Sequence, residues 1–218
     1  CQLLRDDYSH QEDEFLPVSS LLFDKLATYF NSHQLTVNKL LNVGCGGGRL
    51  AIEMSRLATH VDALDFSAAT IQHAVKLQQG EKLRYLAELE GDIVRYEETT
   101  LAQQFGEVTA ENVLFSQGDI TNLKPVFAGY DVIVVQQALE RCYDPKKALN
   151  LLLSRLKPNG LIVVVSDYGF QEQYTPKEKW LGGIKVNGEN YSGFEALSET
   201  LSVSCKHVER LALTKQQK

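Results

Sequence analysis

Blocks of apolar residues alternate with amphipathic stretches along the chain and predict a regular series of elements. Five short apolar runs predict buried strands over residues 39–43, 60–64, 112–116, 130–135 and 161–165. Between them, apolar residues recur at helical spacing over residues 49–57, 68–79 and 145–156. One more helix is expected over residues 20–30, and another begins at Ser192 with Glu195 as its capping box. This alternation predicts a Rossmann-like, doubly wound, mostly parallel α/β sheet.

Three segments do not follow this alternation. Residues 81–111 are too long for an ordinary connection and predict a partial helix with an excursion. Lys-Pro-Asn-Gly at residues 157–160 is a strong turn signal. A last strand is expected over residues 207–213, and the chain stops before an obvious seventh strand, which would leave a sheet edge exposed.

The chemistry is expected where the first strand meets a glycine cluster. Asn42 is the next-to-last residue of the strand, Gly44, Gly46 and Gly48 follow it, and Arg49 opens the next helix. Glycines let the backbone turn sharply and approach a ligand where no Cβ would fit. The strand, turn and helix therefore predict a loop for a nucleotide-like cofactor. The alternative is a glycine turn without a ligand.

An acidic residue ends the second strand. Asp65 stands where a carboxylate accepts hydrogen bonds from ribose hydroxyls. Ser67 is the better helix cap, with Phe66 and Ile71 placed as a hydrophobic staple, so Asp65 is expected to be free. Phe66 could also flank an adenine ring. The alternative role for Asp65 is an ordinary helix cap.

Polar side chains also follow the third and fourth strands. In this fold an acidic residue after the third strand accepts from the adenine amino group, and the next apolar residue packs on the ring. Asp119 and Ile120 fit those roles, although Asp119 could simply initiate a turn. Gln136 and Glu140 follow the fourth strand at its carboxyl end, where open α/β sheets bind ligands.

Composition narrows the function classes. A chain of 218 residues fits one domain with a full core. A net charge of −6 argues against a nucleic-acid partner. No apolar run approaches the roughly 20 residues that span a membrane. Four scattered cysteines show no metal spacing, so we expect free thiols, a cytoplasmic location and no metal.

The glycine motif resembles motif I of the class I S-adenosylmethionine (SAM) methyltransferases. Gly-x-Gly-x-Gly with a polar residue two places earlier is similar to that motif, although most of the family has Asp or Glu where this chain has Asn42. A dinucleotide-binding fingerprint would instead have Gly or Ala at the position that Arg49 occupies. The resemblance implies SAM as cofactor. Residues 1–36 would then be a covering segment, 37–166 the SAM-binding core, 167–191 a substrate loop and 192–218 a closing helix and strand.

Four blocks together resemble the ovothiol-biosynthesis methyltransferases, which N-methylate 5-thiohistidine (4-mercaptohistidine). The blocks are residues 42–49, 115–119, 139–145 and 174–183, and the last is the most specific. The resemblance implies a thiohistidine substrate and a fused or separate sulfoxide synthase partner. Another small molecule, a non-catalytic SAM-binding domain and, third, a NAD(P) oxidoreductase are the alternatives.

The residues that would act on such a substrate follow the fourth and fifth strands. The expected proton acceptors or orienters are Glu140, Asp167 and Tyr168. Arg141 or Lys177 could hold the substrate carboxylate. The aromatic side chains that could stack on the imidazole are Tyr143, Tyr174 and Trp180. For each of these residues, ordinary packing or surface exposure is the alternative.

Overall fold

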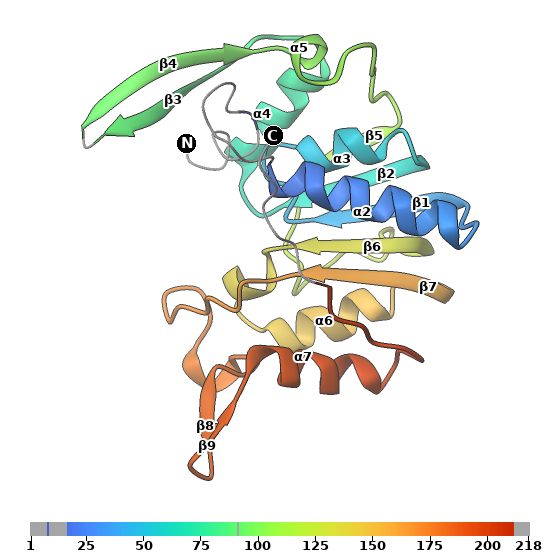
Figure 1. The fold of residues 1–218 in the computed structure, drawn as a ribbon, viewed down its shortest axis with the longest axis vertical. Coiled ribbons are helices and arrows are strands. Elements are labelled where there is room, and N and C mark those ends of the chain that lie inside the picture. The colour runs from blue at the N-terminus through green and yellow to red at the C-terminus, as the bar shows by residue number, and fades with distance from the viewer. Residues whose placement is uncertain (1–7, 9–16, 91, 212–218) are drawn as a thin grey trace. The chain divides into compact units, whose positions relative to one another are not determined.

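The computed structural model describes Tyr8, residues 17–90 and residues 92–211 (Figure 1). Its helices are α2 (Val18–Ser32), α3 (Arg49–Met54), α4 (Ala68–Gln78), α5 (Leu101–Phe105), α6 (Pro145–Leu153) and α7 (Gly193–Ser202), with 3-10 turns η1 (Leu139–Arg141) and η2 (Lys177–Lys179). Its strands are β1 (Val37–Val43), β2 (Ala58–Asp65), β3 (Leu83–Glu90), β4 (Ile93–Thr99), β5 (Val113–Gln117), β6 (Tyr130–Gln136), β7 (Leu156–Val165), β8 (Ile184–Val186) and β9 (Glu189–Tyr191).

The main sheet has the strand order β5-β2-β1-β6-β7. The pairs β1–β2, β2–β5 and β6–β7 are all parallel. The predicted doubly wound, parallel α/β fold is therefore confirmed. Contacts divide the chain into two compact units, one up to residue 117 and one over residues 118–212, and each is described by itself below.

The core of the first unit is built on β1 and β2. Leu40, Leu41, Val61 and Leu64 are fully buried, as expected for parallel strands covered on both faces. Helix α2 packs on α3, and α4 packs on β2 and β5. The carboxyl end of β1 thus leads into the glycine cluster from a rigid base.

The long connection after α4 is a β-hairpin followed by a short helix. Strands β3 and β4 pair antiparallel and form the long two-stranded ribbon of Figure 1. Leu83, Tyr85 and Ala87 alternate inward on β3, which is the period of a strand. Helix α5 begins with a capping box between Thr100 and Gln103. The hairpin confirms the expected excursion, and the expected partial helix is the short helix α5.

The second unit contains β6, the helix after it and β7. Val132 to Val135 are fully buried on β6. The Asp144 side chain caps α6 by accepting from the Lys147 amide, and Pro145 occupies the first turn. Residues 157–160 lie inside β7, so the predicted turn does not separate the helix from the strand, although Asn159 has a left-handed φ of +63°. A register shift opposite Tyr130 and Val132 accommodates them as an irregularity in the strand.

The last elements confirm one prediction and correct another. Ser192 and Glu195 form the expected capping box at the start of α7. Strands β8 and β9 form a small hairpin inside the predicted substrate loop. Residues 207–211 form no strand, so the predicted final strand is wrong there, and residues 212–213 lie outside the described residues. Strand β7 is accordingly an edge of the sheet and is nowhere fully buried.

Candidate cofactor and acceptor sites

The glycine cluster is tied by its backbone to the end of β2. The amides of Gly44 and Cys45 donate to the carbonyl of Leu64 at 2.8 and 3.0 Å, and the amide of Gly48 donates to the carbonyl of Cys45 at 2.9 Å. Gly44, Gly46 and Gly48 have φ of +72°, +55° and +91°, a region that favours glycine. The loop therefore has a conformation that other residues would strain.

Gly48 is also required for packing. A Cβ at this position would lie 2.8 Å from Cζ of Phe115 and 2.9 Å from Cβ of Ala74. The absence of a side chain here lets the loop lie against β5 and α4. This packing is a structural reason for glycine, and the prediction that Gly48 also makes room for a cofactor stays a prediction.

The Asp65 carboxylate bridges the glycine loop and the start of α4. One oxygen accepts from the Gly46 amide at 3.0 Å and the other from the Ser67 amide at 2.9 Å. The prediction that Asp65 is free is therefore wrong, although each oxygen keeps a further lone pair. Ser67 caps α4 through the Thr70 amide, as predicted. Phe66 is 76% exposed, so it forms no staple and its ring stays available.

Asp119 and Ile120, which were predicted to contact the adenine, lie in the second unit. Oδ1 of Asp119 accepts from the amide and hydroxyl of Thr121 at 2.8 and 2.7 Å, so this exposed residue forms the turn that was its alternative role. Ile120 is buried beside it. Gln136 is the half-buried last residue of β6. Binding of a cofactor by these three residues stays a prediction.

Glu140 is a buried carboxyl group in η1, just after β6. It is 4% exposed, and the Ser166 hydroxyl at the end of β7 donates to its Oε1. Ser166 in turn accepts from the Tyr168 amide at 3.0 Å. Oε2 of Glu140 is buried and has no hydrogen-bond partner among the residues that the structure describes. One oxygen is thus fixed by the protein, and the other is unused.

The other two expected proton acceptors are less suited to that role. Asp167 is exposed, and its Oδ1 accepts from the Gly169 amide at 2.8 Å. Tyr168 has a left-handed backbone with φ of +58°, and its ring packs over Gly193, where a Cβ would lie 2.3 Å from Cδ1. Burial raises the pKa of the Tyr168 phenol, which keeps it protonated at neutral pH. Tyr168 is better placed to donate a hydrogen bond than to accept a proton.

The Trp180 side chain is held by its own loop. Its indole nitrogen donates to the carbonyl of Thr175 at 2.8 Å, and its ring stacks on Phe170 with centroids 6.1 Å apart. Nζ of Lys177 lies 5.9 Å from the centroid of the Trp180 ring. Thr175 is fully buried and donates to the carbonyl of Cys142 at 2.7 Å. Sequence reasoning missed Thr175, which anchors the loop to the segment after η1.

A hollow of about 630 Å³ in the second unit is lined by η2, α6 and α7. Trp180 lines it beside the ion pair of Lys179 and Asp144, whose atoms are 3.0 Å apart. The other predicted substrate residues do not line this hollow; they are Arg141, Tyr143, Tyr174 and Lys177, and all are exposed. The structure thus brings only one predicted substrate residue to it.

A family model described as a methyltransferase domain matches residues 9–194. This chain belongs to that methyltransferase family. SAM is its cofactor, as the glycine motif implied. Among the described residues, no helix is long and apolar enough to cross a bilayer.

Several curated relatives of this methyltransferase are named for O-methylation. Ubiquinone biosynthesis O-methyltransferases match from Pasteurella multocida, at 30% identity over 59% of this chain and 46% of the relative, and from Erwinia tasmaniensis, at 30% over 68% and 51%. The chain thus spans about half the length of these relatives. The four ovothiol-like blocks implied N-methylation, and these relatives give that finer reading no support.

Solved structures with this fold differ in their activities. The plantazolicin methyltransferase BpumL aligns with a TM-score of 0.51 at 21% identity, covering 76% of this chain and 52% of BpumL. The [4+2]-cyclase SpnF aligns with a TM-score of 0.53 at 20% identity, covering 83% and 57%. These similarities show the fold alone, since it is shared by a transferase and a cyclase.

The residues around the glycine loop fit SAM as a ligand. Asn42 is fully buried at the end of β1, and neither its amide nitrogen nor its oxygen has a partner among the residues described. Buried polar groups are normally hydrogen-bonded, so a side chain with two such atoms marks a place for polar ligand atoms. The amide oxygen can accept from the methionyl ammonium, although it supplies no charge.

Proposed function

We propose that this methyltransferase transfers the methyl group of SAM to a small-molecule acceptor. The observation that carries the proposal is the buried, unpartnered Asn42 amide at the head of the glycine loop. Asp65 would accept from the ribose hydroxyls through its remaining lone pairs while it holds Gly46. When bound, SAM supplies a sulfonium-activated methyl group, so the protein has chiefly to position the acceptor.

In this proposal Glu140 receives the acceptor proton. Its Oε1 is held by Ser166, which orients the carboxylate, and its Oε2 is buried and unused. A hydroxyl or ring N–H can donate to that oxygen and lose its proton as the new bond forms. The O-methyltransferase relatives favour a hydroxyl oxygen as the first acceptor to test.

A ring nitrogen of 5-thiohistidine is the second acceptor. The hollow beside Trp180 carries both charges of the Lys179–Asp144 pair, which match the carboxylate and ammonium of an amino acid. Against this, the indole nitrogen and one face of Trp180 are already engaged within the loop. The two acceptors therefore have to be compared directly.

The deciding experiment is mass spectrometry of products after incubation with SAM and either a hydroxylated ubiquinone precursor or 5-thiohistidine. A methylated product together with S-adenosylhomocysteine (SAH) supports the proposal and identifies the acceptor atom. Glu140→Gln should lower turnover by roughly 10²–10⁴-fold, the range for general base catalysis. Glu107→Gln, an exposed matched control outside the predicted substrate loop, should not change turnover. Tight SAH binding with no product from either acceptor would favour a non-catalytic SAM-binding domain.

A further inference from the structure

Tyr8 contacts the cofactor loop from far away in the sequence. Its side chain is fully buried, although it lies in a polar stretch of the chain. Its hydroxyl donates to the carbonyl of Gly47 at 2.9 Å. Gly47 stands between Gly46 and Gly48, at the most flexible point of the glycine cluster. One hydroxyl therefore fixes the peptide that follows Gly47.

The backbone and ring of Tyr8 are held as well. Its carbonyl accepts from the Tyr85 hydroxyl at 2.7 Å and from Nε2 of Gln104 at 3.5 Å. Its ring meets that of Phe105 edge-on, with centroids 6.3 Å apart. The Arg49 guanidinium carbon lies 5.7 Å from the Tyr8 ring centroid and 5.2 Å from that of Phe105.

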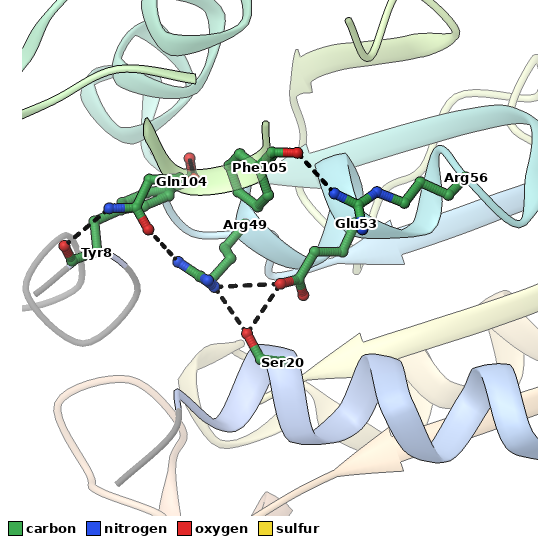
Figure 2. Close-up of polar contacts among 8 residues, drawn as sticks. Tyr8, Ser20, Arg49, Glu53, Arg56, Gln104 and Phe105 are labelled. Carbon is green, nitrogen blue, oxygen red and sulfur yellow. Dashed lines mark hydrogen bonds and ion pairs between the residues drawn. The ribbon is translucent and has the colours of Figure 1, made fainter. Parts of the chain in front are cut away.

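Arg49 is the centre of this cluster, which Figure 2 shows with α2 and the residues of α3 and α5 around it. Nε of Arg49 donates to the Ser20 hydroxyl at 3.0 Å, and Nη1 donates to Oε1 of Gln104 at 2.8 Å. Oε1 of Glu53 lies 3.4 Å from Nε of Arg49 as its ion-pair partner, and the same oxygen accepts from the Ser20 hydroxyl at 2.9 Å. Because Arg49 is also the first residue of α3, the cluster adjoins the glycine loop directly.

We propose that Tyr8 is a positioning residue for SAM. The Arg49 cluster holds Tyr8, and Tyr8 holds the Gly47 carbonyl, so the glycine loop is fixed before the cofactor arrives. A loop of three consecutive glycines loses much conformational entropy on binding unless it is already ordered. Preordering removes that cost and strengthens affinity without any contact between Tyr8 and the cofactor. The inference rests on the assignment of SAM to this loop.

The test is Tyr8→Phe, which removes the hydroxyl and keeps the ring. We expect the Kd for SAH, measured by calorimetry, to rise about 3–10-fold, the effect of one hydrogen bond. The KM for SAM should rise by the same factor, and kcat at saturating SAM should not change. Tyr96→Phe is the matched control, since Tyr96 is 83% exposed on β4, and its Kd should equal that of the wild type.

Tyr85→Phe gives an independent test, because it removes the shorter of the two hydrogen bonds to the Tyr8 carbonyl and leaves the Tyr8 side chain intact. The bond from the Tyr85 hydroxyl to Oε2 of Glu97 is lost with it. It should raise the Kd for SAH by a smaller factor, about 2–5-fold. If Tyr8 and Tyr85 act on the glycine loop through the same cluster, their effects are coupled. The Tyr8→Phe/Tyr85→Phe double variant should then raise the Kd by less than the product of the two single increases.

The outcomes separate this inference from the cofactor assignment. If the wild type binds SAH and both variants bind it equally well, Tyr8 is only structural and the inference is wrong, even if urea denaturation shows a loss of stability. If Tyr8→Phe fails to fold, the kinetics of Tyr85→Phe decide. A higher KM for SAM with an unchanged kcat supports the inference, and an unchanged KM refutes it. If the wild type itself does not bind SAH, the cofactor site and the inference fall together.

Discussion

Replacing Asp65 by alanine should damage both the loop and the cofactor site. The change removes two hydrogen bonds to a charged acceptor, one from Gly46 at 3.0 Å and one from Ser67 at 2.9 Å. Bonds to charged groups are each worth about 1.5–3 kcal/mol, and both of these are partly exposed, so the lower end applies. We expect the free energy of unfolding without cofactor to fall by about 3 kcal/mol, the lower value for two such bonds.

Cofactor affinity should fall in addition. If the remaining lone pairs of Asp65 accept from ribose hydroxyls, their loss costs about 1.5–3 kcal/mol of binding, or roughly 10–150-fold in the Kd for SAH. Asp65→Asn separates the two effects, because an amide oxygen can keep one of the two backbone bonds. It should recover part of the stability and little of the affinity, since the charge is lost.

Urea denaturation without ligand measures the first effect, and calorimetry with SAH measures the second. Asp24→Ala on the exposed side of α2 is the control, and it should change neither quantity by more than about 0.5 kcal/mol. An Asp65→Ala variant that is destabilised but binds SAH with wild-type affinity would show that Asp65 only shapes the loop.

Two further predictions concern stability. Gly48→Ala should lower the free energy of unfolding by about 2–4 kcal/mol in urea denaturation, since its Cβ would meet Phe115 at a left-handed φ; wild-type stability would contradict the packing argument. Burial raises the pKa of Glu53 more than Arg49 lowers it, so the folded chain binds more protons and this carboxyl destabilises the fold as pH rises above about 4.5. The stability of Glu53→Gln relative to wild type should therefore increase from pH 4.5 towards neutrality, and a pH-independent difference would refute this sign.

The parts of the fold that follow from local signals were predictable. The buried strands are continuous apolar runs, and such runs need no knowledge of distant contacts to be recognised. The caps at Ser67 and Ser192 are set by side chains within three residues, and both form as predicted. The glycine cluster was found in the same way, because its spacing is a local property of the sequence.

Several of the errors share a physical cause, which is competition from distant partners. Asp65 was expected to be free because Ser67 caps α4, but the Gly46 amide lies within reach only after β1 and β2 pair. The turn at residues 157–160 is absorbed by a register shift against β6, which no local pattern shows. Tyr8 had no signal at all, since its burial depends on Arg49 and Phe105 in the folded unit.

The buried carboxylate of Glu140 limits the class of acceptor. An unused oxygen of a buried carboxyl group is costly unless something donates to it, and Ser166 already satisfies the other oxygen. An acceptor that carries a proton on its reacting oxygen or nitrogen supplies that donor and gains a base in the same contact. A thioether or a tertiary amine has no such proton and would leave Oε2 unpaired.

A phenol and its O-methyl ether are therefore the most informative pair of ligands to compare. The phenol should bind the wild type more tightly than the ether, and Glu140→Gln should reduce that preference. Equal binding of the two by the wild type would mean that Glu140 faces the protein and not the acceptor.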